Sequence, residues 1–131
     1  MAVLNVTDPK ISFKHYNNDG NRYIDTFVIM HLGAGAERTR KGNDIWSHKW
    51  VLEGGLYQVD ETQIFSFLTV PGDCKLGMCT HELGHLAFGW PDLYNVDYTS
   101  EGVDVWCLMA TDSYNSDESN PNMRCTWCKV D

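Results

Sequence analysis

No run of about 18 apolar residues occurs in the chain, and residues 1–10 lack the basic-then-apolar pattern of a secretion signal. Basic residues are also few: the chain has 10 Lys and Arg and 18 Asp and Glu, which gives a net charge of −8. This balance argues against nucleic acid and against an anionic membrane surface as partners. We expect a soluble protein whose negative charge bound cations would partly neutralise.

The sequence also shows no internal repeat and no second domain along its 131 residues. A chain of this length buries roughly two-thirds of the surface that it exposes when unfolded, which is enough for one core. Apolar residues make up 43% and charged residues 21% of the chain, within the globular range. We expect one folded domain that covers residues 1–131 and is a monomer.

Cysteine is odd in number, so at least one thiol lacks a disulfide partner within the chain. Cys125 and Cys128 form a C-x-x-C pair with no second pair at zinc-finger spacing. This favours a disulfide or two buried thiols over a zinc knuckle. The five cysteines are Cys74, Cys79, Cys107, Cys125 and Cys128.

A stretch rich in β-branched and aromatic residues predicts a strand at 23–31, after turn-forming Asn, Asp and Gly residues at 16–21. Its unbroken apolar core, residues 27–30, is typical of a strand covered on both faces near the middle of a sheet. Two short β-like runs flank Gly54-Gly55 within residues 46–59, which predicts a tight hairpin.

A further strand is expected at 64–70, followed by a helix that begins near Gly77 and ends at Gly89 and Pro91. Ser, Asn and Asp dominate residues 111–122, which indicates a long surface loop. Strands followed by a helix and an irregular end favour an α+β domain. The helix residues expected on its buried side are Met78, Leu83, Leu86 and Ala87.

The helix carries a His-Glu-x-x-His pattern, His81 to His85. Four helical residues advance the chain by about 400°, so His81 and His85 point the same way and can bind one zinc ion. Glu82 lies about 100° around the helix, beside the metal, where its carboxylate can take a proton from zinc-bound water. The alternative is a chance arrangement, but the strand before the helix and the Gly-x-Pro-Asp break after it favour zinc.

A catalytic zinc needs three protein ligands and one open position for water, so the third ligand must come from elsewhere. The turn at Gly89 reverses the chain and Pro91 stiffens it, which favours the Asp92 carboxylate. In the alternative interpretation Asp92 only caps the turn. Other candidates for the third ligand are His31, His48 and Asp97.

The longer run from His81 to Tyr94 resembles the immune inhibitor A family of secreted bacterial metallopeptidases, relatives of the metzincins. Its most specific part is Gly89-Trp90-Pro91-Asp92-Leu93-Tyr94. Similar segments are residues 25–37, 44–50 and Trp106-Cys107-Leu108-Met109-Ala110. The resemblance therefore spans nearly the whole chain.

This resemblance implies a zincin-like, metzincin-type α+β catalytic domain, with a twisted mixed sheet packed on the active-site helix and an edge strand that pairs with extended substrate. It places Met109 in a methionine turn beneath the zinc and implies an extracellular protein. Tyr114, five residues after Met109, would polarise the scissile carbonyl by analogy with some metzincins. His48 would line the cleft or orient a carboxylate.

Two features depart from the family pattern. Gly89 stands four residues after His85, where the metzincin-type pattern has three, and we interpret this as a longer helix with the same exit turn. Residues 125–130 look like a segment after which family members continue. The chain is therefore either a truncated catalytic domain or a short natural member.

Oxygen ligands at close spacing around Gly20 predict a calcium site, and members of the family bind structural calcium. The alternative is a simple Asp-Gly turn, because no acidic residue starts the loop and no glutamate closes it. The candidate ligands are Asn17, Asp19, Asn21 and Asp25.

The sequence is compatible with three functions. In the first, the protein is a zinc-dependent endopeptidase in which water activated by zinc and Glu82 attacks internal peptide bonds of proteins. In the second, an inactive module binds zinc and recognises proteins without cutting them. Glu82 favours the first, because a purely structural zinc site is normally closed by a fourth protein ligand. A zinc hydrolase with a non-peptide substrate is a third hypothesis.

Overall fold

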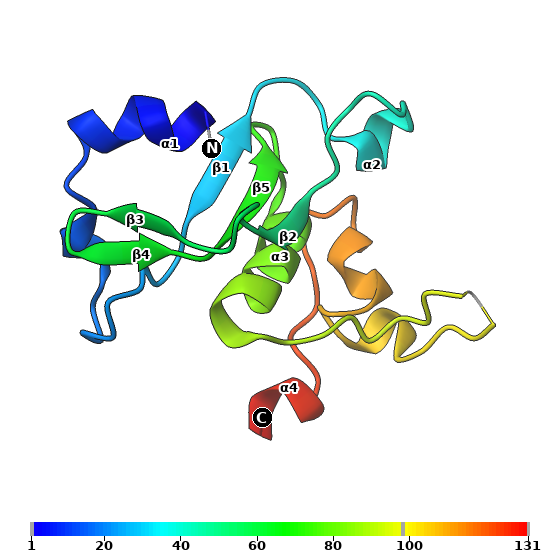
Figure 1. Cartoon of the computed structure of the whole chain (residues 1–131). Helices are drawn as coiled ribbons and strands as arrows, with labels where there is room; N and C mark the ends of the chain where they lie inside the picture. Colours follow the sequence, from blue (N-terminus) through cyan, green and yellow to red (C-terminus); the bar gives the residue numbers. More distant parts are fainter. Residues whose placement is uncertain (1, 98, 131) are drawn as a thin grey trace.

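A mixed three-stranded sheet lies at the centre of the computed structural model, which describes residues 2–97 and 99–130 (Figure 1). Its order is β1-β5-β2, with β1 (Val28–His31) parallel and β2 (His48–Val51) antiparallel to the central strand β5 (Ser66–Pro71). The expectation of a mixed sheet within an α+β domain is confirmed.

Helix α3 (Leu76–Phe88) packs against β5 and β2 (Figure 1). Shorter elements complete the described fold: a second sheet of β3 (Tyr57–Val59) and β4 (Thr62–Ile64), the helices α1 (Ala2–Thr7), α2 (Ala36–Thr39) and α4 (Trp127–Val130), and the 3-10 helices η1 (Asp8–Lys10), η2 (Phe13–Tyr16), η3 (Asp104–Trp106) and η4 (Thr111–Tyr114).

The strand predicted at 23–31 forms only at Val28–His31, and its central position was predicted wrongly. β1 lies at the edge of the sheet, with Val28 and Met30 exposed. The middle position belongs to β5, where four consecutive residues from Leu68 to Pro71 are buried. Both segments are apolar runs of similar length, so pairing partners that lie far away in the sequence decide which one is central.

The predicted hairpin within residues 46–59 is also wrong in its pairing. Gly54 and Gly55 do form a tight turn at positive φ, closed by a hydrogen bond from the Gly55 amide to the Leu52 carbonyl. The two strands then diverge, because β2 pairs with β5 while β3 pairs with β4. The strand expected at 64–70 is divided between β4 and β5, which are separated at Phe65.

The buried face of α3 differs from the expected one. Met78 is buried as predicted, but Leu83 and Ala87 are exposed. The helix instead buries small and polar residues, because it lies close to the chain that follows η3 and forms one wall of a cleft. Its buried residues are Gly77, Met78, His81, Glu82 and Gly84.

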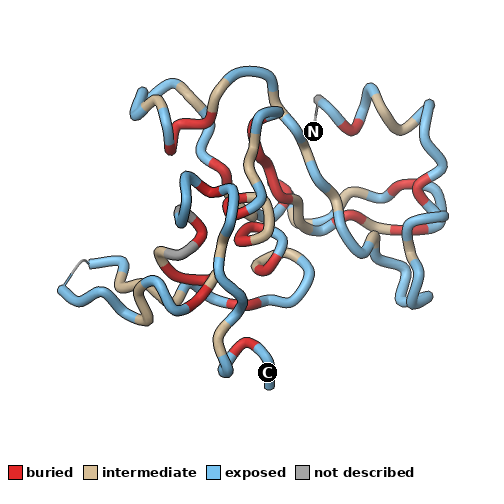
Figure 2. Tube along the Cα trace, turned by 180° about the vertical axis from the view of Figure 1, so that it is seen from behind, coloured by how far each residue is buried: buried red, intermediate tan, exposed pale blue. Residues whose placement is uncertain are grey.

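Buried apolar residues form two clusters, where one core was expected. Figure 2 shows buried segments in the sheet and α3 and also around β3 and β4. The first cluster joins the β3–β4 sheet to the N-terminal helices and consists of Leu4, Phe13, Leu52, Val59 and Ile64. The second lies under the exit of α3 and consists of Trp90, Cys107, Met109, Ala110 and Cys128.

Most described residues of the predicted surface loop 111–122 are exposed, but it begins with η4 and two of its residues are buried. Ser113 and Glu118 are buried, and the Glu118 carbonyl accepts a hydrogen bond of 2.7 Å from the Gly77 amide. The Ser113 carbonyl lies only 1.9 Å from the point that a Cβ atom on Gly77 would occupy. A polar segment thus packs on the first turn of α3, which requires glycine there.

We predict that Gly77→Ala destabilises the protein by about 2 kcal/mol, because backbone must move to relieve the contact. The free energy of unfolding in urea measures this change. Gly42→Ala is the matched control, since no atom lies within 4 Å of its added Cβ and its φ is not positive. Equal stability of the two variants would contradict the packing of Ser113 on α3.

Candidate metal centre

Helix α3 presents His81 and His85 one turn apart, and the chain after α3 brings Asp92 back to them. The Nε2 atoms of the two histidines lie 3.1 Å apart, and Asp92 Oδ1 lies 3.2 Å from each. They form one of two groups of candidate metal ligands among the described His, Cys, Asp and Glu side chains. The structure therefore brings together the three residues that the sequence analysis names as zinc ligands.

Backbone carbonyls set the orientation of both imidazole rings. His81 Nδ1 lies 2.9 Å from the Leu108 carbonyl oxygen, and His85 Nδ1 lies 2.5 Å from that of Trp90. Because a carbonyl only accepts, each Nδ1 carries the hydrogen, and each Nε2 of a neutral ring is left as an acceptor. Two imidazole lone pairs and a carboxylate oxygen then point at one spot, which suits a cation.

The pKa shifts of these side chains agree with this conclusion. Burial raises the pKa of Asp92, but the adjacent His81 and His85 rings, which donate to its carboxylate when they are protonated at Nε2, hold that pKa well below its usual range. Burial likewise lowers the pKa of His85, yet Asp92 and the Trp90 carbonyl raise it overall. Positive charge is therefore favoured between the three side chains.

The exit of α3 explains how Asp92 reaches the histidines despite the extra residue before Gly89. The Gly89 amide bonds the Gly84 carbonyl, five residues back, so the last turn is one residue wider than an α-helical turn. The Trp90 amide also bonds that carbonyl, and Gly89 adopts a left-handed conformation with φ 69°. Asp92 reaches the histidines through this wide turn, and whether other family members have the same exit turn stays a prediction.

The segment Cys107–Ala110 lies beneath the centre and contacts both of its parts. Leu108 accepts from His81, as described, and the Met109 carbonyl accepts a hydrogen bond of 2.7 Å from the amide of Leu93, next to Asp92. Met109 is fully buried, and its sulfur lies 2.7 Å from where a Cβ on Gly84 would stand. Met109 therefore packs against α3 at Gly84, the residue before His85.

Glu82 is buried beside the three candidate ligands and is not one of them. Burial raises the pKa of its carboxyl, although the neighbouring His81 and His85 oppose that shift. The carboxyl lines a cleft of about 360 Å³ together with all three ligands. This is the position that a general base beside a metal requires.

Two further side chains line the same cleft. His48 lines the cleft from β2, which is one of its two predicted roles. Its Nδ1 lies 2.6 Å from the Trp46 carbonyl oxygen. Tyr94 stacks on the His81 ring, with centroids 6.5 Å apart. Tyr94 also lines a second cavity of about 350 Å³, which it shares with His81 and Glu82. Sequence reasoning assigned Tyr94 no role, although the Pro-Asp-Leu-Tyr motif contains it.

Other candidates lie elsewhere. His31, at the end of β1, and Asp97, in a turn with Asn95 and Thr99, belong to neither group of ligands found among the described residues. Tyr114 ends η4, but its side chain is outside the described part of the structure, so its role stays a prediction.

The predicted calcium loop is held by its own hydrogen bonds. The Asp19 carboxylate accepts from the amide and side chain of Asn21, and Asp25 accepts from the amide of Asn18. Asp19, Asn21 and Asp25 line one hollow, whereas Asn17 lines another. The calcium site stays a prediction.

Comparison with known proteins decides the family. Residues 12–125 match the model of the immune inhibitor A peptidase M6 catalytic domain. The chain belongs to this family. The match confirms the resemblance drawn from the sequence. The matched residues include His81, His85 and Asp92.

Two curated proteins support the assignment to the immune inhibitor A family. The chain is 32% identical over 133 residues to the Pre-pro-metalloprotease PrtV of Vibrio cholerae serotype O1, from strains M66-2 and ATCC 39315 / El Tor Inaba N16961. The alignment covers 85% of this chain but only 14% of each relative. The chain thus spans a small part of the length of these relatives. No helix in its described part is long and apolar enough to cross a membrane.

We predict that Asp92→Ala weakens zinc affinity by at least about 100-fold, because even outer-shell partners of a metal change affinity by that order. Competition with a fluorescent chelator measures the affinity. Asp97→Ala is the matched control, since Asp97 is exposed and bonds only within its own turn among the described contacts. Unchanged affinity in Asp92→Ala would exclude Asp92 as the third ligand.

Proposed function

We propose that the chain is a zinc-dependent endopeptidase domain that hydrolyses internal peptide bonds of proteins. One observation carries the proposal: two imidazole nitrogens and a carboxylate oxygen converge within 3.2 Å of one another, with a buried glutamate beside them. Membership of a peptidase family supports the hydrolytic chemistry. The name of the metalloprotease relative supports a metal.

The donor set fits zinc in both chemistry and spacing. Two histidine nitrogens and one carboxylate oxygen are the ligand types of a catalytic zinc site with an open fourth position. Ligand atoms at about 2.0–2.1 Å from a tetrahedral ion lie about 3.3 Å apart. The separations of 3.1 and 3.2 Å between His81, His85 and Asp92 are close to that value. Little movement is needed to hold the ion.

Zinc, when bound, lowers the pKa of a coordinated water toward 7 and polarises the carbonyl of the scissile bond. Glu82 then acts as the general base: its carboxylate removes a proton from the attacking water. The same carboxyl group delivers that proton to the amine nitrogen of the leaving group. Burial makes the Glu82 carboxylate a stronger base than an exposed one, since it raises its pKa.

The sheet supports a protein substrate. Within the described residues β2 pairs with β5 alone, so its other edge is available to an extended peptide. Ser47, His48 and Lys49, at the start of β2, line the same cleft as Glu82. A peptide added to this edge would pass along the candidate ligands.

The finer expectations belong to the same proposal. The mixed sheet over α3 and the packing of Met109 against α3 at Gly84 support a zincin-like fold with Met109 in a methionine turn. Structural calcium rests on the spacing of oxygen ligands around Gly20 and on the family resemblance, and an extracellular location rests on the resemblance alone.

We predict that Glu82→Gln keeps its zinc but loses activity by about 10²–10⁴-fold, the usual contribution of a general base. The assay is cleavage of an unfolded protein, with mass spectrometry of the products to identify internal cuts. Metal content is measured on the same samples. Glu61→Gln, at an exposed position outside the cleft, is the matched control and is expected to cut like the original protein.

The same samples separate the competing functions. Removing the zinc with a chelator should abolish cleavage, and adding zinc back should restore it. Bound zinc in a protein that cuts no better than Glu82→Gln would favour the non-catalytic module. A protein that binds no zinc after purification in its presence would contradict the proposal altogether.

A further inference from the structure

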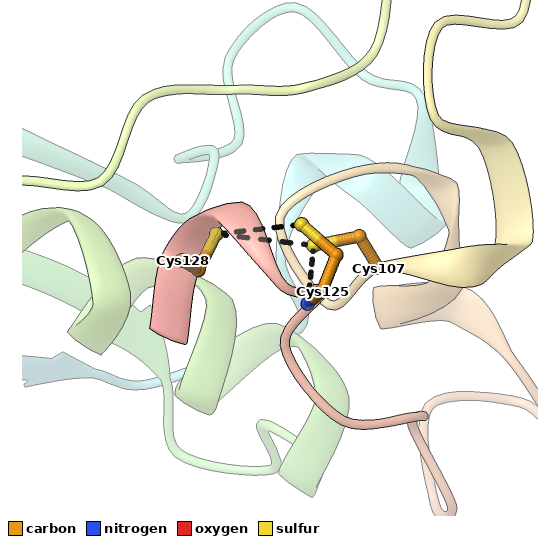
Figure 3. Close-up of side chains that lie close together, drawn as sticks. All are labelled: Cys107, Cys125 and Cys128. Atoms are coloured by element: carbon orange, nitrogen blue, oxygen red, sulfur yellow. Dashed lines mark hydrogen bonds between the residues drawn. The ribbon is translucent and has the colours of Figure 1, made fainter. Parts of the chain in front are cut away.

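Three cysteine side chains converge in the second hydrophobic cluster. Figure 3 shows Cys107, Cys125 and Cys128 turned toward one another, from the chain after η3, the chain before α4 and α4 itself. The Sγ atoms of Cys107 and Cys128 lie 4.0 Å apart, and those of Cys125 and Cys128 lie 3.8 Å apart. All three lie within 4.8 Å of one another, and Cys107 and Cys128 are fully buried.

These separations suit sulfur ligands around one ion. Sulfur atoms at about 2.3 Å from a tetrahedral zinc ion lie about 3.8 Å apart, and two of the three observed separations are close to this value. A disulfide would join only two of the sulfurs at about 2.0 Å. The third cysteine would remain an unpaired thiol next to that disulfide.

Backbone amides also point at these sulfurs. The Cys125 amide lies 3.2 Å from Cys107 Sγ and donates a hydrogen bond to it. Amide donors favour negatively charged sulfur, which is the form that binds metal ions.

We propose that Cys107, Cys125 and Cys128 form a second metal site, which binds a thiophilic divalent cation of the zinc class. On binding, the thiols release their protons to solvent and each sulfur gives a lone pair to the ion, with a water or other small ligand at the fourth position. The sequence interpretation disfavoured a zinc knuckle because Cys125 and Cys128 lack a second C-x-x-C pair. The fold supplies the missing ligand, Cys107, from 18 residues before Cys125.

The position of the three-thiol site indicates a structural role. Cys107 directly precedes Leu108, whose carbonyl orients His81, and Met109, which packs under α3. Cys125 and Cys128 belong to the C-terminal part of the described chain. A shared ion would tie that part to the segment beneath the metal centre. This is the arrangement of an outer support for a catalytic site.

The test uses Co²⁺ as a spectroscopic probe in a protein that lacks the two histidine ligands. The reduced His81→Ala/His85→Ala chain is expected to bind one Co²⁺ and to show the near-ultraviolet charge-transfer absorption of cobalt bound to thiolates. Adding Cys125→Ser should weaken that absorption strongly and lower Co²⁺ affinity by at least about 100-fold. The readout does not depend on peptidase activity, so it separates this proposal from the proposed function.

Cys74→Ser in the same background is the matched control, because Cys74 lies outside the three-thiol group. It should keep the full absorption. A second measurement avoids substitutions near the site: native mass spectrometry of the original chain, purified with zinc, should show two zinc ions. The proposal is overturned if the reduced double-histidine variant binds no Co²⁺, or if Cys125→Ser leaves the absorption unchanged.

Discussion

Two hydrogen bonds to carbonyls of one segment, Cys107–Ala110, hold the candidate metal centre in place. The Leu108 carbonyl accepts from His81 Nδ1, and the Met109 carbonyl accepts from the amide of Leu93. The first bond fixes the ring of a histidine on α3, and the second fixes the chain that carries Asp92. Because both acceptors belong to Cys107–Ala110, this segment sets the distance between the histidines on α3 and Asp92. The close approach of Met109 to Gly84 keeps the segment against the helix, where any side chain larger than hydrogen would meet its sulfur.

Helix α3 buries a face of polar and small residues, and both imidazoles on that face have hydrogen-bond partners. The two imidazoles bond backbone carbonyls through Nδ1 and meet Asp92 through Nε2. Buried polar groups without partners would lower stability by about 1–3 kcal/mol each. The leucine that an amphipathic helix would bury, Leu83, is instead exposed. The chemistry of the cleft therefore decides the orientation of the helix, and apolar burial is left to the two clusters on either side.

Two sets of candidate ligands adjoin the segment Cys107–Ala110 but differ in chemistry. His81, His85 and Asp92 supply nitrogen and oxygen at a cleft, as in catalytic sites with an open position. Cys107, Cys125 and Cys128 supply sulfur in a largely buried cluster, as in structural sites. Burial separates their roles, since an ion surrounded by buried thiols is shielded from substrate while an ion at the cleft contacts it.

The sequence by itself determined the parts of the site that depend on local geometry. A helical repeat of 3.6 residues aligns His81 with His85 and offsets Glu82, and a glycine with left-handed φ ends the helix at Gly89. Contacts between distant segments could not be predicted from it: the central place of β5, the pairing of β2, and the meeting of Cys107 with the C-x-x-C pair. Those features depend on which surfaces pack together across tens of residues. Local periodicity carries no information about such pairings, so only the tertiary structure decided them.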